Sequence, residues 1–242
     1  MTILVTNDDG QTYGAEILLE TAKKFDKNSF AIVPDRQQSA VSSALTLHKP
    51  LRLKQIREDI FTLNGTPADI VLFAINSGKF PKPSLVLSGI NSGDNTCVDS
   101  LLSSGTLGAC WQAVLYSVPA IAFSLYKSPE NWGNRNPWKK QSELLKKYTE
   151  EILKLLIKKK EKDVFYNVTF PDNLSNSKII FPKKLQRQRF KAIITERKDP
   201  YGVPYYWLSG NFKNIEKGAD LYEVVVNKNI TITSAHLRFW KD

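Results

Sequence analysis

The segment Ile3-Leu-Val-Thr-Asn-Asp-Asp-Gly10 decides the fold of this 242-residue chain. Its apolar, β-branched start predicts a buried strand, and Asn7 with Gly10 predicts a tight turn where that strand ends. Two adjacent carboxylates, Asp8 and Asp9, are therefore expected at the carboxyl end of the first strand, where open α/β sheets bind ligands. Adjacent like charges favour a divalent cation between them, although the same pair could simply cap the next helix.

The following segments extend this start into a strand–helix–strand unit. Residues 15–25 have apolar side chains at helical spacing, and Phe30-Ala-Ile-Val33 is a second apolar run that ends at Pro34. A unit of this kind joins two parallel strands by a helical crossover. Further buried strands are expected at residues 85–87 and 119–124. The pattern predicts a three-layer α/β/α, Rossmann-like fold with a mostly parallel sheet.

Two further segments are predicted to add to this core. Residues 45–53 alternate apolar and polar side chains, and residues 60–63 could pair with them. Asn64-Gly65 is a turn, and the next four residues supply an N-cap (Thr66), a proline at the first helical position and a carboxylate at the third. This motif predicts a helix that runs to about residue 77, and structure alone could explain it.

The second half of the chain has a different character. Residues 138–160 carry apolar side chains on one stripe, with lysine and glutamate opposite, which predicts a long amphipathic helix on the sheet. Later strands or hairpins are predicted at residues 166–170, 178–181, 205–207, 224–226 and 230–233. We expect a single domain over residues 1–242. Residues 1–125 would form the core with the metal site, and residues 126–242 an extension with a C-terminal β-hairpin for oligomerisation.

Composition limits the class of protein. A hydrophobic content of 42% allows a sizeable core, and neither a long apolar run nor a secretory signal is visible, so no membrane partner is expected. Cys97 and Cys110 show neither a disulfide framework nor zinc spacing, which favours a reducing, cytoplasmic setting. With only two histidines, any metal must be held mainly by oxygen. The net charge of +10 favours anionic partners without choosing among them.

Polar loops that resemble the Asp8 loop in topology follow the other strands. Ser39 lies in the loop after Pro34, without a G-x-S-x-G elbow or a histidine nearby, so it suits a metal or phosphate better than a nucleophilic role. Asn91 could give a carbonyl oxygen to a metal, and Asn95 could hydrogen-bond a ligand. Ser104-Gly-Thr106 precedes an apolar helix whose N-terminus could hold a phosphate.

In this order, these segments resemble the SurE family of metal-dependent nucleoside monophosphate phosphatases. The resemblance covers essentially the whole chain. The segments that carry it are Ile3-Leu-Val-Thr-Asn-Asp-Asp-Gly10, Pro34-Asp-Arg-Gln-Gln-Ser-Ala40, Leu45-Thr-Leu-His-Lys-Pro50, Gly65-Thr-Pro-Ala-Asp69, Ser88-Gly-Ile-Asn91, Ser104-Gly-Thr106, Asn167-Val-Thr-Phe-Pro171, Tyr205-Tyr-Trp-Leu-Ser-Gly210 and Ile230-Thr-Ile-Thr233.

The resemblance implies a set of site residues. Metal ligands would be Asp8, Asp9, Ser39 and Asn91. Phosphate contacts would be Asn95, Ser104, Gly105 and Thr106, and we also expect Asn7 and Gly10, which flank the acid pair, to bind substrate. By this resemblance the chain departs from the family at four positions. Asp94 and Cys97 replace smaller residues, Ser103 replaces a frequent tyrosine, and the closing strand lacks the usual proline after Thr233. These changes leave the metal site intact and bear on substrate preference.

The implied activity is hydrolysis of nucleoside 5′- or 3′-monophosphates to nucleoside and phosphate. One Mg²⁺ or Mn²⁺ would polarise a phosphoryl oxygen and lower the pKa of bound water. Asp8 and Asp9 are the catalytic candidates, and either could instead act as a base or nucleophile. The resemblance also implies a homodimer or homotetramer, often with exchanged C-terminal segments.

Two other classes of protein are alternatives. The first is a non-enzymatic nucleotide-binding or signalling domain, but phospho-acceptor domains need a third aspartate where this chain has Ser88. A dinucleotide dehydrogenase is disfavoured because no G-x-G-x-x-G follows the first strand. The second alternative is a nucleic-acid binder, which rests on charge. The basic run at residues 183–189 has no interleaved aromatic pattern, so a solvated surface is expected there and no specific nucleic-acid partner.

Overall fold

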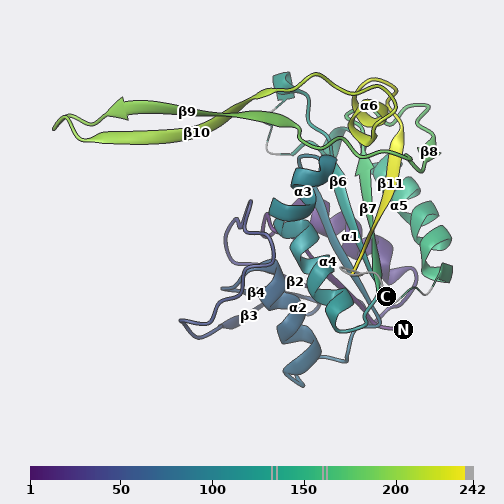
Figure 1. Ribbon diagram of the computed structural model, residues 1–242. Coiled ribbons are helices and arrows are strands. Elements are labelled where there is room, and N and C mark those ends of the chain that lie inside the picture. The colour runs from purple at the N-terminus through teal and green to yellow at the C-terminus, as the bar shows by residue number, and fades with distance from the viewer. Residues whose placement is uncertain (132, 135, 160, 162, 238–242) are drawn as a thin grey trace, which may run out of the picture.

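The computed structural model describes residues 1–131, 133–134, 136–159, 161 and 163–237. A nine-stranded sheet runs through the body of the molecule (Figure 1). In spatial order its strands are β3 (Leu53–Arg57), β4 (Ile60–Leu63), β2 (Phe30–Pro34), β1 (Ile3–Thr6), β5 (Leu85–Ser92), β6 (Ala120–Leu125), β7 (Val164–Phe170), β11 (Ile230–His236) and β8 (Ile179–Ile180). The strands from β4 to β7 are parallel, whereas β3 and β11 are antiparallel to β4 and β7.

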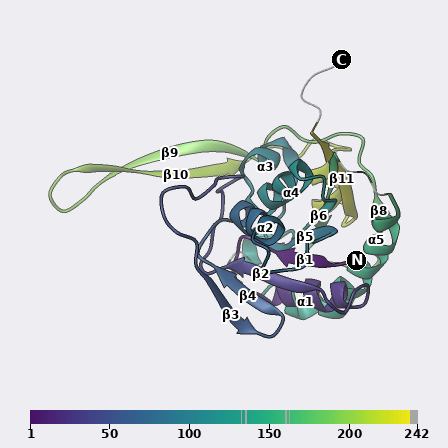
Figure 2. The same cartoon turned by 90° about the horizontal axis from the view of Figure 1, so that it is seen from below.

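Helices cover both faces of this sheet. The first face carries α1 (Tyr13–Lys23) and α5 (Ser142–Leu156), and the second carries α2 (Pro67–Asn76) and α4 (Gly105–Leu115), as Figure 2 shows. The side chains of β1 alternate between the two cores: Ile3 and Val5 pack on the first face and Leu4 on the second. A strand buried on both faces needs a continuous apolar run, which the sequence has. The predicted three-layer fold is confirmed.

The register of the central strands brings their loops together. Thr6, the last residue of β1, pairs with Ser88 of β5, and Asn91 near the end of β5 pairs with Ser124 of β6. The parallel crossover from β1 to β2 sets the loop after Pro34 beside the same edge. The segments that follow β1, β2 and β5 therefore meet at one edge of the sheet, as predicted.

Local motifs hold the α2 region as the sequence predicts. Thr66 caps α2, and its backbone N–H donates to the Asp69 carboxylate while the Asp69 N–H donates to the Thr66 hydroxyl. Asp69 also accepts from the Thr46 N–H at 2.9 Å, which ties down the preceding loop. That loop, residues 45–50, is irregular, so the ribbon partner of β4 begins later than predicted, at Leu53.

Two helices differ from the sequence predictions. Residues 97–103 form α3 (Cys97–Ser103), for which we predicted no element, and α6 (Asp220–Val225) takes the place of the strand predicted at residues 224–226. Apolar Leu221 and Val224 are buried, and contacts with the body override the strand preference of the valines. The basic run at residues 183–189 is also not uniformly solvated, because Gln186 is buried.

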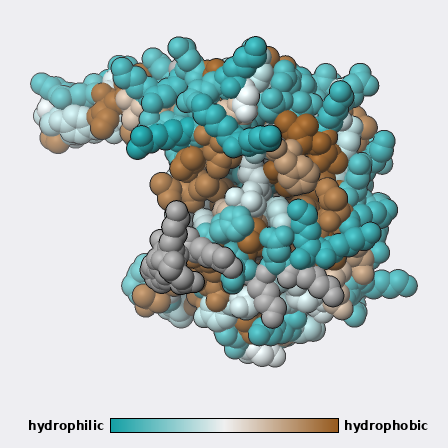
Figure 3. Space-filling view, turned by 45° about the vertical axis from the view of Figure 1, so that its right-hand side comes forward, coloured by the Kyte–Doolittle hydropathy of each residue, from teal (hydrophilic) through white to brown (hydrophobic). Residues whose placement is uncertain are grey.

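A separate antiparallel pair, β9 (Phe190–Lys198) and β10 (Pro204–Phe212), forms an arm that projects from the body (Figures 1 and 2). Leu208 lies directly opposite Ile194, and Leu208 is 76% exposed. The surface of the arm, at the upper left of Figure 3, carries both hydrophilic and hydrophobic atoms. The hairpin predicted around residues 205–207 is therefore present, with apolar side chains on its surface.

Two observations bear on the setting of the protein. Within the described ranges, no helix has the length and apolar character needed to cross a membrane. Cys97 and Cys110 are both buried and unbonded, as the absence of a disulfide framework in the sequence predicted.

Candidate active site

Asp8 lies at the bottom of the site, between β1 and the N-terminus of α4. Its side chain accepts a hydrogen bond from the Thr106 hydroxyl at 2.6 Å, and only 4% of the residue is exposed. Burial, followed by the neighbouring charge of Asp9, raises the pKa of Asp8 to about 7, against the lowering effect of Thr106. A β-carbon at Gly105 would lie 2.9 Å from the Asp8 β-carbon, so a glycine is needed for α4 to approach this closely.

Asp9 connects two other loops to this point. One of its oxygens accepts from the Ser92 N–H at 3.1 Å, at the end of β5. The other accepts from the Gln37 amide at 3.4 Å, and the same amide donates to the Ser39 hydroxyl at 3.0 Å. Burial raises the pKa of Asp9, and Lys127 exerts an opposing, weaker electrostatic influence. Asp9 therefore lies between the end of β5 and the loop after β2.

Asn91 lies next to Ser92, which binds Asp9. Its amide nitrogen donates to the Gly93 carbonyl at 2.7 Å, so its side-chain oxygen is the atom left for a metal. Ser39 therefore shares the Gln37 amide with Asp9, and Asn91 is adjacent to Ser92, whose N–H binds Asp9. The four predicted metal ligands come from three separate segments, the loops after β1 and β2 and the end of β5, at one edge of the sheet.

The chemistry of these donors fits a hard divalent cation. Among the described residues, no group of three or more His, Cys, Asp or Glu side chains is placed to hold a metal. Two carboxylates with two neutral oxygens form a different donor set, of the kind that Mg²⁺ and Mn²⁺ prefer. Asp8 is buried and Asp9 is half-buried, and the pKa of each is raised, so a positive partner would favour the ionised form of both.

Asn7 and Gly10 shape the loop that carries the acids. The Asn7 amide donates to the Gly10 carbonyl at 2.7 Å and to the Thr12 hydroxyl at 3.2 Å, and its oxygen accepts from the Gly10 N–H at 3.1 Å. Gly10 has a φ of +82°, which a residue with a side chain rarely adopts. Both residues therefore hold the turn, and the role in substrate binding stays a prediction.

The predicted phosphate-binding residues fall into two groups. Ser104 caps α4 by accepting from the Leu107 N–H at 3.3 Å, while its own N–H donates to the Ser100 carbonyl at 3.0 Å. Thr106 binds the Asp8 carboxylate through its hydroxyl and through its backbone. Asn95 is held by other strands: its N–H donates to the Ser124 hydroxyl of β6, and its carbonyl accepts from the Asn167 amide of β7. The Asn95 side-chain nitrogen is buried without a hydrogen-bond partner among the described residues. A buried donor of this kind is suited to a ligand.

Gln37 is a side chain at the site that the sequence analysis missed. Its amide bridges Asp9 and Ser39, although it is exposed and lies in a loop without regular structure. Its place two residues before Ser39, in a loop already assigned to the site, was the only signal that could have indicated it.

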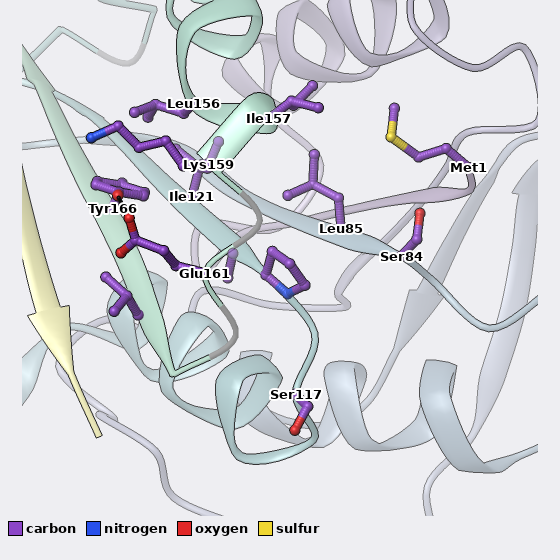
Figure 4. Close-up of a pocket in the computed structure, with 13 residues that line it drawn as sticks. Met1, Ser84, Leu85, Ser117, Ile121, Leu156, Ile157, Lys159, Glu161 and Tyr166 are labelled. Atoms are coloured by element: carbon purple, nitrogen blue, oxygen red, sulfur yellow. Dashed lines mark hydrogen bonds between the residues drawn. The ribbon is translucent and has the colours of Figure 1, made fainter. Parts of the chain in front are cut away.

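A second, mostly apolar cavity of about 380 Å³ lies at the opposite end of the strands (Figure 4). Leu85 and Ile121, near the amino ends of β5 and β6, line it together with Leu156 of α5. The acid pair lies at the carboxyl ends of the strands. This cavity is therefore separate from the candidate site.

Parallel strands whose carboxyl ends carry acids, amides and a helix N-terminus define an α/β protein with a ligand site at a sheet edge. The chain belongs to the SurE family, since the model described as "Survival protein SurE" matches residues 3–192. It is 37% identical to the protein named 5′-nucleotidase SurE of Thermofilum pendens, over 98% of this chain and 91% of that protein. The protein of the same name from Geotalea daltonii is 38% identical, over 98% and 93%.

A solved structure agrees with these matches. The SurE protein from Aquifex aeolicus superposes with a TM-score of 0.79 at 29% identity. The alignment covers 100% of this chain and 95% of that one.

Proposed function

We propose that this chain is a phosphoric monoester hydrolase that releases phosphate from nucleoside monophosphates. The observation that carries the proposal is the convergence of Asp8, Asp9, Ser39 and Asn91 at the end of β1, beside the N-terminus of α4. Relatives with 34% to 38% identity are named 5′-nucleotidase SurE, which supports a nucleotide as the substrate.

The residues at this edge have separate roles in metal binding, phosphate binding and charge stabilisation. Asp8, Asp9, Ser39 and Asn91 would hold one Mg²⁺ or Mn²⁺, which supplies Lewis-acid activation of the phosphoryl group and of water when bound. The N-terminus of α4 at Gly105 would bind phosphoryl oxygens. The Thr106 hydroxyl orients Asp8, and the Asn95 amide would give a further hydrogen bond to the phosphate.

The test is release of inorganic phosphate from a panel of nucleoside 5′- and 3′-monophosphates. We expect release with Mg²⁺ or Mn²⁺ and a fall to the buffer background when a chelator is added, because the carboxylates alone repel a phosphate. Activity that survives complete metal removal would contradict the role of the metal. A chain that binds nucleotides without hydrolysing any member of the panel would support the non-enzymatic alternative.

We also propose that the arm joins copies of this chain into a homodimer or homotetramer. A two-stranded sheet alone is marginally stable in water, and both faces of this one carry exposed apolar side chains, including Leu208 and Trp207. Packing against a second copy would cover them.

The arm proposal predicts the effect of Leu208→Glu. A charge at an apolar contact is costly to bury, so this variant should be largely monomeric where the wild type is larger than its 27.4 kDa chain. Light scattering on a size-exclusion column measures the mass. Leu115→Glu, the same change at an exposed leucine at the end of α4, is the matched control and should leave the mass unchanged. A monomeric wild type at assay concentration would refute the proposal.

A further inference from the structure

The segment that carries Asn95 is joined to the base of the arm by a buried ion pair. We call residues 94–99 the Asn95 segment and residues 186–189 the arm root. The Arg189 guanidinium, one residue before β9, pairs with the Asp94 carboxylate, one residue before Asn95. The Asp94 side chain is fully buried and that of Arg189 is 11% exposed.

Further contacts hold the same two segments together. The Val98 N–H donates to the Gln186 carbonyl at 2.9 Å, and the Asp99 carboxylate accepts from the Arg189 N–H at 3.0 Å. Asp220, at the start of α6, accepts from the N–H groups of Cys97 and Gln186 at 2.7 and 2.9 Å. The Asn95 segment forms no helix or strand before Cys97, so contacts with distant residues set its position. Asn95 itself is held by Ser124 and Asn167, and the residues on either side of it are held by the arm root and Asp220.

Stability alone does not account for an ion pair at this place. Replacing a buried pair by apolar side chains is often neutral or stabilising, whereas a charge pair permits fewer alternative packings. The Arg189 guanidinium also lies over the rings of Tyr126 and Phe190, with distances to the ring centres of 5.8 and 4.9 Å. Its position is thereby fixed from the body side and from the arm side at once.

We propose that the Asp94–Arg189 pair is a latch that holds the Asn95 segment in its phosphate-binding position against the arm root. Asp94 and Arg189 are positioning residues in this proposal, which rests on the proposed function of the site. The latch makes phosphate affinity depend on the base of the arm. It acts on the phosphate side of the site alone, because none of the four predicted metal ligands lies in the Asn95 segment.

The test compares Arg189→Gln and Asp94→Asn with the double variant. Each single variant should raise the inhibition constant of inorganic phosphate and the KM of the nucleotide by about tenfold or more, since small displacements of positioning groups cost up to about 10²-fold. The double variant should recover part of the loss, because no unpaired buried charge remains. Arg189→Lys should also recover part of it. The metal concentration for half-maximal activity should stay unchanged throughout.

Lys184→Gln is the matched control, because it removes one positive charge near the arm root that pairs with Glu216 on the surface. It should leave phosphate inhibition unchanged. The latch would be overturned if phosphate inhibits both single variants as strongly as the wild type. It would also be overturned if Lys184→Gln weakens phosphate inhibition as much as they do. Additive losses in the double variant would overturn it as well.

Hydrogen exchange separates the latch from the proposed function. In Arg189→Gln, the amides of Asn95 and Val98 should exchange faster than in the wild type and in Lys184→Gln, whether or not the protein hydrolyses a nucleotide. If the wild type hydrolyses none, the proposed function fails, and this exchange result alone decides the latch. Unaltered exchange of these amides would refute it.

Discussion

Asp8→Asn and Asp9→Asn should each lower divalent-dependent phosphate release by about 10³-fold or more while the fold is retained. Loss of one neutral donor at a developing charge costs about 10²–10³-fold, and a carboxylate that holds the cation should count for more. Both side chains are held by neighbours, Asp8 by Thr106 and Asp9 by Ser92, and asparagine can keep one such bond. The measurement is phosphate release at saturating metal, with circular dichroism as the check on folding.

Asp35→Asn is the control for charge. Asp35 is exposed on the loop after β2, in the same stretch as Ser39, and the same carboxylate-to-amide change there should leave activity near that of the wild type. If both Asp8→Asn and Asp9→Asn stay fully active, the acid pair is not the catalytic centre. If Asp35→Asn loses as much phosphate release as Asp8→Asn and Asp9→Asn, the loss reflects the removal of any negative charge from these loops and not the loss of a metal ligand.

In the absence of metal, the wild type should lose stability as the pH rises from about 4 to 7. The pKa of Asp8 is about 7 in the folded protein and 3.8 for an exposed aspartate, so the folded state keeps a proton that the unfolded state has released. The contribution of Asp8 to stability is therefore fully present below pH 4 and is lost as the pH rises through 7. A shift of about three pKa units corresponds to roughly 4 kcal/mol.

Asp8→Asn should remove this loss, because an amide does not ionise. Urea unfolding in a chelator should show the variant more stable than the wild type at pH 8, and the difference should shrink toward pH 4. Asp35→Asn should follow the wild type across the range. Added Mg²⁺ or Mn²⁺ should restore wild-type stability at pH 8 and have less effect on Asp8→Asn. If Asp8→Asn is less stable than the wild type at pH 8 without metal, the raised pKa of Asp8 is contradicted.

The parallel core was predictable because its signals are local. The apolar runs of β1 and β6 appear directly in the sequence, and both strands are buried. Thr66 with Asp69 encodes the start of α2. The order of the strands along the chain was sufficient to predict that the segments with Asp8, Ser39 and Asn91 lie at one edge, because parallel strands have their carboxyl ends on the same side of the sheet.

What the sequence did not reveal depends on contacts between distant segments. The N–H groups in the first turn of α3 are satisfied by Asp220 and by the carbonyls of Gln186 and Arg187, nearly a hundred residues or more away, and not by a local cap. Arg189 was assigned to a solvated basic run because its partner, Asp94, lies far from it along the chain. Gln37 joins the site through side-chain geometry that spacing alone does not encode.

The position of β11 has a consequence for how the chain is made. This strand lies between β7 and β8 in the sheet, yet the arm and α6 are synthesised between β8 and β11. Until residues 230–236 emerge, β7 presents an unpaired backbone edge, which is a template for wrong pairing with another nascent chain. Folding of the central sheet can therefore begin early, but its protection from aggregation comes late.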